Sequence, residues 1–170
     1  VFGHAASTYT FSQLRHLVSI VPQHASLVSG TIRTNLTWRD AHATDEDLWK
    51  ALELAQAADF VREKPCQLDS PVEAGGTNFS GGQRQRLTIA RALVGNPRIV
   101  ILDDSASALD FATDASLRRA LYSLRREMTS VIISQRVAAV MQADQTLVLD
   151  HGYQVGLGTH KELLATCPLY

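Results

Sequence analysis

Two glycines stand at the start of a predicted helix, where the backbone can come close to an anion. The stretch Ser80-Gly81-Gly82-Gln83 precedes a run with helical spacing of apolar residues, and Ser80 is a good N-cap. Glycine leaves room for a ligand, and the free amides and the helix dipole favour a phosphate there. A bare Ser-Gly-Gly sequence is more often a plain loop before an amphipathic helix. The apolar stripe of this helix consists of Leu87, Ala90, Leu93 and Val94.

Two carboxylates follow the next predicted strand. Residues 99–102 form a continuous apolar run, of the kind found in a strand that is covered on both faces. The run ends in Asp103 and Asp104. A glycine-containing helix start followed by an apolar strand with terminal carboxylates is far more specific than either feature alone.

These two motifs together resemble the nucleotide-binding domain of ABC transporters. Residues 79–83 resemble the signature motif of the family, and residues 99–103 resemble its Walker B strand. In this family ATP lies between the Walker motifs of one domain and the signature of another, so the resemblance implies ATP and a second nucleotide-binding domain. The implied ATP contacts of this chain are Ser80, Gly81, Gly82 and Gln83.

Three further positions match motifs of the family. Asp103 lies where the family holds Mg²⁺, because a hard cation prefers carboxylate oxygens. Gln23 follows a short strand and Pro22; by itself it would be an exposed loop amide, but the resemblance implies a Q-loop glutamine that touches magnesium and takes part in catalysis. Residues 107–110 resemble the D-loop, so the resemblance places Asp110 at the interface between two domains, with the ATP-binding residues.

Two positions depart from the family pattern. Asp104 replaces the glutamate that polarises the attacking water, and its carboxylate is set back by roughly 1.5 Å, the length of a C–C bond. A positioned general base contributes about 10²–10⁴ in rate, although an aspartate can still act through a bridging water. Gln135 stands in place of the switch histidine; it can donate a hydrogen bond to a phosphate but carries no charge. The resemblance therefore implies a degenerate ATP site beside an intact signature, as in heterodimeric exporters.

A phosphate-binding Walker A loop, GxxxxGK[ST], is absent from the sequence. The only lysines are Lys50, Lys64 and Lys161, and none follows a glycine. In the family this loop lies upstream of the position that matches Val1, so we expect the chain to be the C-terminal part of a nucleotide-binding domain. The resemblance also implies transmembrane domains as partners, and a place on the cytoplasmic face of the cell membrane through a membrane domain that this chain lacks.

The predicted fold class is α/β, because strands alternate with helices. We expect a P-loop NTPase-like parallel sheet core, without the N-terminal part that carries Walker A. Residues 1–24 and 96–170 would form the core lobe, and residues 25–95 an inserted α-helical subdomain with the signature. The expected later elements are helices at 44–60 and 113–127, a buried strand at 131–134, a hairpin turning at 150–152, and a last helix that begins with a capping box at 159–162.

Composition limits the function classes. The 170 residues carry a net charge of −1, which gives no basic surface for nucleic acid. No apolar run approaches the roughly 20 residues needed to cross a bilayer. The two cysteines, Cys66 and Cys167, lie far apart without metal spacing.

These motifs leave four functions to compare. The first is the ATPase part of a membrane exporter, and the second is a non-hydrolytic regulatory module with the same fold. A soluble ABC ATPase of DNA maintenance would need a long coiled coil between Gln23 and Ser80, and that interval is too short and lacks heptads. A remnant without function is the fourth. The exporter is the preferred interpretation, and the transported substrate would be chosen by membrane helices.

Overall fold

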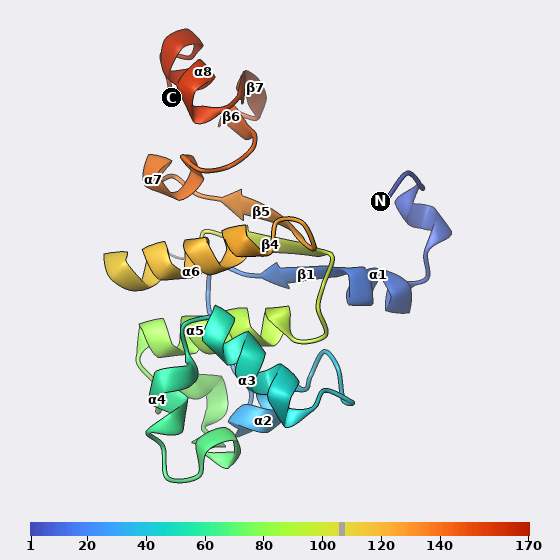
Figure 1. Ribbon diagram of the computed structural model, residues 1–170, viewed down its shortest axis with the longest axis vertical. Helices are drawn as coiled ribbons and strands as arrows, with labels where there is room; N and C mark the ends of the chain where they lie inside the picture. The colour runs from blue at the N-terminus through green and yellow to red at the C-terminus, as the bar shows by residue number, and fades with distance from the viewer. Residues whose placement is uncertain (106–107) are drawn as a thin grey trace. The chain divides into compact units, whose positions relative to one another are not determined.

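The computed structural model describes residues 1–105 and 108–170 and has an α/β arrangement (Figure 1). Contacts divide it into two units, Val1–Val131 and Ile132–Tyr170, which are described separately. The elements in chain order are η1 (Ala6–Thr8), α1 (Phe11–Leu17), β1 (Val18–Val21), β2 (Gly30–Thr31), α2 (Ile32–Leu36), α3 (Asp45–Leu54), α4 (Ala58–Arg62), η2 (Gln67–Asp69), β3 (Pro71–Val72), η3 (Ala74–Gly76), α5 (Gly81–Leu93), β4 (Ile99–Asp103), α6 (Phe111–Ser123), β5 (Thr129–Ile133), α7 (Val137–Val140), β6 (Thr146–Asp150), β7 (Tyr153–Gly158) and α8 (His160–Thr166).

The central sheet has the strand order β1-β4-β5, and β1 pairs with β4 in parallel. Their register places Val21 opposite Leu102, so both strands end at the same edge of the sheet. Gln23 follows the end of β1, and Asp103 and Asp104 lie at the end of β4. The parallel pairing therefore brings the predicted Q-loop and Walker B residues together, at the edge where ligands bind in such sheets.

The prediction that residues 99–102 are covered on both faces is wrong for this structure. Val100 and Leu102 are buried, whereas Ile99 and Ile101 are partly exposed. Ile20, which pairs with Ile101, is 62% exposed. The buried face is the one that packs toward α5, and the opposite row of β-branched side chains meets solvent.

Helix α5 occupies the centre of the first unit. It contacts β1, α2 and α3, and Figure 1 shows it between strand β1 and helices α2–α4. Its predicted apolar stripe is buried, since Leu87, Ala90, Leu93 and Val94 are each at most 5% exposed. The helix ends at Leu93, two residues before Gly95, whose φ of 77° is accessible to glycine without strain.

The single helix expected over residues 44–60 is two helices, α3 and α4. Gln56 has a left-handed backbone, with φ of 58°, and the amide of Ala57 bonds back to the carbonyl of Leu52. The alanine-rich sequence gives no glycine or proline at this break, so propensity alone predicted continuity. The start of α3 is as expected, with a capping box between Thr44 and Asp47.

Two later expectations also need correction. The helix expected at 113–127 is α6, which begins at Phe111 because Asp110 caps it, and ends at Ser123. Strand β5 lies close to the expected position, but four of its five residues are exposed, so it is not buried. The predicted hairpin is confirmed as the antiparallel pair β6–β7, and the last capping box, Thr159 with Glu162, begins α8. No helix in the described part of the chain is both long and apolar enough to span a membrane.

Candidate ATP-binding and signature regions

The predicted signature loop, residues 80–83, is built as a capping box at the start of α5. The Ser80 hydroxyl oxygen accepts a hydrogen bond from the Gln83 amide at 3.2 Å, and the Gln83 side-chain oxygen accepts one from the Ser80 amide at 3.1 Å. The backbone amides of Ser80 and Gln83 are therefore used to fix the loop itself. The arrangement holds the helix N-terminus in one conformation before any ligand arrives.

The two signature glycines have different surroundings. Neither amide of Gly81 or Gly82 has a hydrogen-bond partner within residues 1–105 and 108–170. A Cβ atom at Gly81 would meet nothing closer than Arg84 at 4.0 Å, whereas one at Gly82 would lie 3.3 Å from the carbonyl oxygen of Ala108. Gly81 therefore faces open space, and Gly82 is where α5 passes close to the backbone of Ala108.

Three arginines of α5 donate to the carbonyls of surrounding loops, contacts that no motif of the sequence indicates. Arg84 donates to the carbonyl of Phe79 at 2.6 Å, directly before the signature serine. Arg86 donates to the carbonyl of Gln56 at 2.7 Å, and Arg91 donates to that of Ser26 at 2.9 Å. The sequence does contain a signal for these contacts, because the arginines recur along a helix that also carries an apolar stripe.

Arg86 also connects the signature helix with an aromatic cluster. Its guanidinium lies 4.8 Å from the ring centroid of Phe60, and Phe60 meets Phe79 edge to face at 6.4 Å. Burial lowers the pKa of Arg86, while the charges of Asp110 and Asp59 act in the opposite direction. The residue before the signature serine, Phe79, is itself only 3% exposed, so the loop is attached to a packed core.

The second candidate region joins Gln23 and Asp104. The Gln23 amide nitrogen donates to the Asp104 carboxylate at 3.3 Å, although the two residues are 81 positions apart. Both side chains are at the surface, and the bond is long for an N–H···O contact. The structure thus brings together two of the three residues predicted to be catalytic.

Asp104 has an unusual backbone conformation. Its φ is 42°, in the left-handed region that non-glycine residues seldom adopt and in which aspartate is enriched several-fold. Such strained residues cluster at functional sites. The conformation also gives a reason for aspartate at this position that the sequence could not show, because glutamate is less well accommodated there.

The residues at this edge fit a partial magnesium site. Asp103 ends β4 with an exposed side chain, and the Gln23 contact with Asp104 uses the amide nitrogen, which leaves the Gln23 amide oxygen available. No group of three or more histidine, cysteine or acidic side chains in the described chain could hold a metal. That is compatible with Mg²⁺, which is often held by one or two carboxylates together with phosphates and water.

Asp110 caps helix α6. Its carboxylate accepts from the Thr113 amide at 2.9 Å and from the Thr113 hydroxyl at 2.7 Å, and the backbone bond is the first cause that lowers the pKa of Asp110. Ser107, the first residue of the predicted D-loop, lies outside the described residues. The D-loop assignment of Ala108, Leu109 and Asp110 therefore stays a prediction.

Gln135 belongs to the second unit. It follows β5 in a bend and is exposed. Its assignment as the counterpart of a switch histidine stays a prediction.

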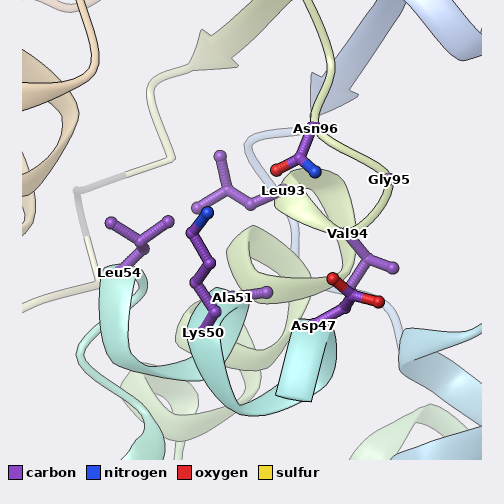
Figure 2. A pocket seen from close by; sticks show the side chains of 8 residues that line it. All are labelled: Asp47, Lys50, Ala51, Leu54, Leu93, Val94, Gly95 and Asn96. Atoms are coloured by element: carbon purple, nitrogen blue, oxygen red, sulfur yellow. The ribbon is translucent and has the colours of Figure 1, made fainter. Parts of the chain in front are cut away.

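A small hollow lies at the other end of the signature helix (Figure 2). It lies between α3 and the turn after α5, whereas the signature residues begin α5. Its Asp47 carboxylate is engaged in the capping box with Thr44. The hollow is therefore separate from the signature loop. It is lined by Asp47, Lys50, Ala51, Leu54, Leu93, Val94, Gly95 and Asn96.

Comparison with known proteins places the chain in a family. The model of the ABC transporter family matches residues 1–107, so the chain belongs to that family. It is 43% identical, over 165 residues, to an uncharacterised ABC transporter ATP-binding protein of Mycobacterium bovis, covering 95% of this chain and 28% of the relative. It is 40% identical, over 169 residues, to a multidrug resistance ABC transporter ATP-binding and permease protein of Lactococcus lactis, covering 99% of this chain and 29% of that protein.

A solved structure agrees with this family. The fold matches a bacterial Atm1-family ABC exporter with ATP bound at a TM-score of 0.90 and 32% identity, covering 96% of this chain and 29% of that one. The α/β fold class with a parallel sheet is thus confirmed, as is the resemblance to an exporter ATP-binding domain. The chain spans less than a third of the length of these proteins. The division into a core lobe and a helical subdomain, at residues 25–95, stays a prediction.

Proposed function

We propose that this chain is the ATP-binding part of a membrane exporter and that it acts in a dimer, in which its signature loop completes the ATP site of a partner domain. The observation that carries the proposal is the state of the loop. Its capping box is closed, the amides of Gly81 and Gly82 are free, and the space at Gly81 is open. A phosphate from outside the chain could therefore approach without any rearrangement of α5.

Of the two ATP sites in such a dimer, the one formed by this chain's own Walker B and Q-loop residues would hydrolyse ATP more slowly. Asp103 and Gln23 would hold Mg²⁺, which neutralises phosphate charge when it is bound. Asp104 would orient the attacking water, but its carboxylate is shorter than that of glutamate and already contacts Gln23. Gln135 would contact the γ-phosphate without adding positive charge. The partner would thus be a second nucleotide-binding domain with its own complete catalytic residues, and the pair a heterodimer.

The membrane domain that such an exporter needs is outside this chain. The Lactococcus relative is named as an ATP-binding and permease protein, which supports transmembrane domains as the second partner. We place the chain accordingly at the cytoplasmic face of the membrane.

Residues 1–170 alone should bind Mg-ATP weakly and not hydrolyse it. The sequence has no lysine after a glycine-rich loop, and that loop supplies most of the amides that surround the β- and γ-phosphates. Calorimetric titration of the isolated chain checks this, and micromolar affinity would contradict it.

The dimer proposal is tested by ATP hydrolysis of the assembled full-length transporter with a wild-type partner. Ser80→Arg or Gly81→Asp should abolish turnover, because a bulky or anionic side chain blocks the phosphate at the helix N-terminus. Asp104→Asn should reduce ATP turnover much less, because that carboxylate belongs to the site that is already impaired. Ala41→Asp is the matched control, since it adds the same charge at an exposed alanine outside the signature.

Equal and nearly complete loss in Gly81→Asp and Asp104→Asn would mean that the chain hydrolyses ATP at its own site, as in a homodimer. Loss in neither would favour a non-hydrolytic regulatory module. One specific observation favours the non-hydrolytic regulatory module: the hydrogen bond from Gln23 occupies the Asp104 carboxylate.

A further inference from the structure

Lys64 places a positive charge over the ring of the residue that precedes the predicted signature serine. Its Nζ lies 4.5 Å from the ring centroid of Phe79. The Phe79 side chain is buried, and its ring also meets Phe60 edge to face at 6.4 Å. A cation within about 6 Å of an aromatic centroid is attracted by the electron density of the ring face. Lys64 and Phe79 therefore form a cation–π pair directly before the loop of residues 80–83.

The ring of Phe79 is the partner that the structure gives to the Lys64 charge. The Lys64 side chain is partly buried, and no ion pair joins it to a carboxylate in the part of the chain that the structure describes. Removing a charge from water costs free energy unless another group compensates. The other two lysines, Lys50 and Lys161, are exposed, and neither lies over an aromatic ring of the described residues. The contact is thus particular to Lys64.

The backbone of Phe79 connects its ring to the predicted signature loop. The Phe79 amide donates to the carbonyl of Gly76 at 3.0 Å, and the Phe79 carbonyl accepts from Arg84 at 2.6 Å. Ser80 follows at once and is the N-cap of α5. Because no residue lies between Phe79 and this cap, a shift of the Phe79 ring would displace the start of α5.

Lys64 itself is held in a turn that follows α4. Its amide donates to the carbonyl of Val61 at 3.2 Å, and its carbonyl accepts from the amide of Gln67 at 3.0 Å. Helix α4 also supplies Phe60, so both side chains that contact the Phe79 ring come from one short stretch of chain. This stretch therefore holds the ring through one electrostatic contact and one aromatic contact.

We propose that Lys64 is a positioning residue of the signature loop: its ammonium, held over the ring of Phe79, keeps the loop in the conformation that it offers to the partner's ATP. The inference rests on the proposed function. It requires a cation at position 64 and an electron-rich ring at position 79, so an apolar contact of the same size would not replace the pair. Lys64 acts here through Phe79 and does not touch the phosphate.

The test changes the electron density of the Phe79 ring and nearly keeps its shape. In the full-length transporter with a wild-type partner, Phe79 is replaced by mono-, di- and trifluorinated phenylalanine, because ring fluorines weaken the attraction for a cation. We expect kcat for ATP hydrolysis to fall stepwise, by about two- to thirtyfold in total, the range that corresponds to the strength of such pairs. KM should stay nearly unchanged. Hydrogen exchange of the bonded amides at residues 83–85, measured without ATP, should become faster in the same order.

Substitutions of the lysine complete the cycle. Lys64→Met removes the charge from a long side chain and should lower kcat about as much as the trifluorinated ring. In this background fluorination should have no further effect, because the cation that it weakens is gone. Lys64→Arg keeps a cation that stacks on aromatic faces and should retain most of the turnover. Lys50→Met is the matched control, and it should leave kcat unchanged. If Lys64→Met does not assemble, Lys64→Gln takes its place.

A fluorine series without effect on turnover and exchange would overturn the inference. Equal fold-losses on fluorination with and without the lysine would do the same, because the loss would then come from ring packing and not from charge. Should Gly81→Asp leave turnover at the wild-type level, the proposed function fails and the inference falls with it. Loss of turnover in Gly81→Asp together with a flat fluorine series would refute the role of Lys64 alone.

Discussion

The signature loop and the Gln23–Asp104 region both face a phosphate in the proposed function, but they are built differently. The loop is held by a reciprocal capping box and by Arg84, which donates to the carbonyl of Phe79 directly before it, while Arg86 bonds α5 to the carbonyl of Gln56. The Gln23–Asp104 region depends on one 3.3 Å hydrogen bond between two surface side chains and on a left-handed aspartate. A preorganised electrostatic site costs no rearrangement when its ligand arrives, so the comparison points to the signature as the working surface.

The largest effect should come from repairing the weaker region. In the full-length transporter, Asp104→Glu together with Gln135→His should raise ATP turnover by about 10²-fold, the lower end of what a positioned base contributes. Asp104→Glu alone should raise it only modestly, because groups that act on the same transition state are not additive. The left-handed backbone at Asp104 adds a further cost for glutamate.

Steady-state turnover of the two single variants and the double variant decides this. Asp150→Glu is the matched control, since it lengthens an exposed aspartate at the end of another strand. A large gain from Asp104→Glu alone would show that Gln135 is not limiting. No gain even in the double variant would mean that something other than these two side chains keeps the site inactive.

A smaller effect tests the rigidity of the signature loop. Ser80→Ala removes the N-cap and should destabilise the first turn of α5 by about 1 kcal/mol. Hydrogen exchange of the bonded amides at residues 83–85 should then be roughly fivefold faster, because local opening becomes more frequent. Thr10→Ala, which removes the same kind of cap from α1, is the control and should leave these amides unchanged.

The two signature glycines should respond differently to one added methyl group. Gly81→Ala has open space and should stabilise the helix by up to about 1 kcal/mol, the difference in helix propensity. Gly82→Ala should be less stable than Gly81→Ala, because its Cβ would press on the Ala108 carbonyl at 3.3 Å. Thermal unfolding of both variants measures the difference. Equal melting temperatures would show that the backbone at Ala108 shifts without loss of stability.

The smallest expected effect is on the pH dependence of stability. It should differ between the Ser80 cap of α5 and the Asp110 cap of α6, because only aspartate ionises. Hydrogen bonds from Thr113 lower the pKa of Asp110 in the folded state, so its contribution is present above the unfolded pKa and is lost as pH falls through the folded one. Asp110→Asn keeps a good cap without a charge. Wild type should therefore be slightly more stable than Asp110→Asn at pH 6, and the difference should shrink as pH falls through the lowered pKa of Asp110.

Hydrogen exchange at the start of α6 follows this titration. The start of α5 serves as the internal reference, because serine does not ionise and its cap should show no such change. A difference between wild type and Asp110→Asn that persists in acid would contradict the assigned cause.

Much of the fold could be read from local signals. The caps at Thr44, Ser80 and Thr159, the strand at 99–103 and the hairpin around 150–152 are all where the sequence predicted them, because side-chain capping and turn chemistry act over a few residues. The errors arose where local propensity was overridden. The break at Gln56 has no glycine or proline, and the exposure of Ile101 depends on what packs against the sheet.

The sequence by itself indicated the family, because motifs are matters of residue type and spacing, and the signature motif and the two departures at Asp104 and Gln135 stay predictions from the same signal. Only the tertiary structure decided that Gln23 contacts Asp104, that Asp104 has a left-handed backbone, and that Arg91 reaches the carbonyl of Ser26. These contacts join residues 65 and 81 positions apart. The parallel pairing of β1 with β4 and the packing of α5 on that sheet set such distances, and neither is encoded in any short stretch of the chain.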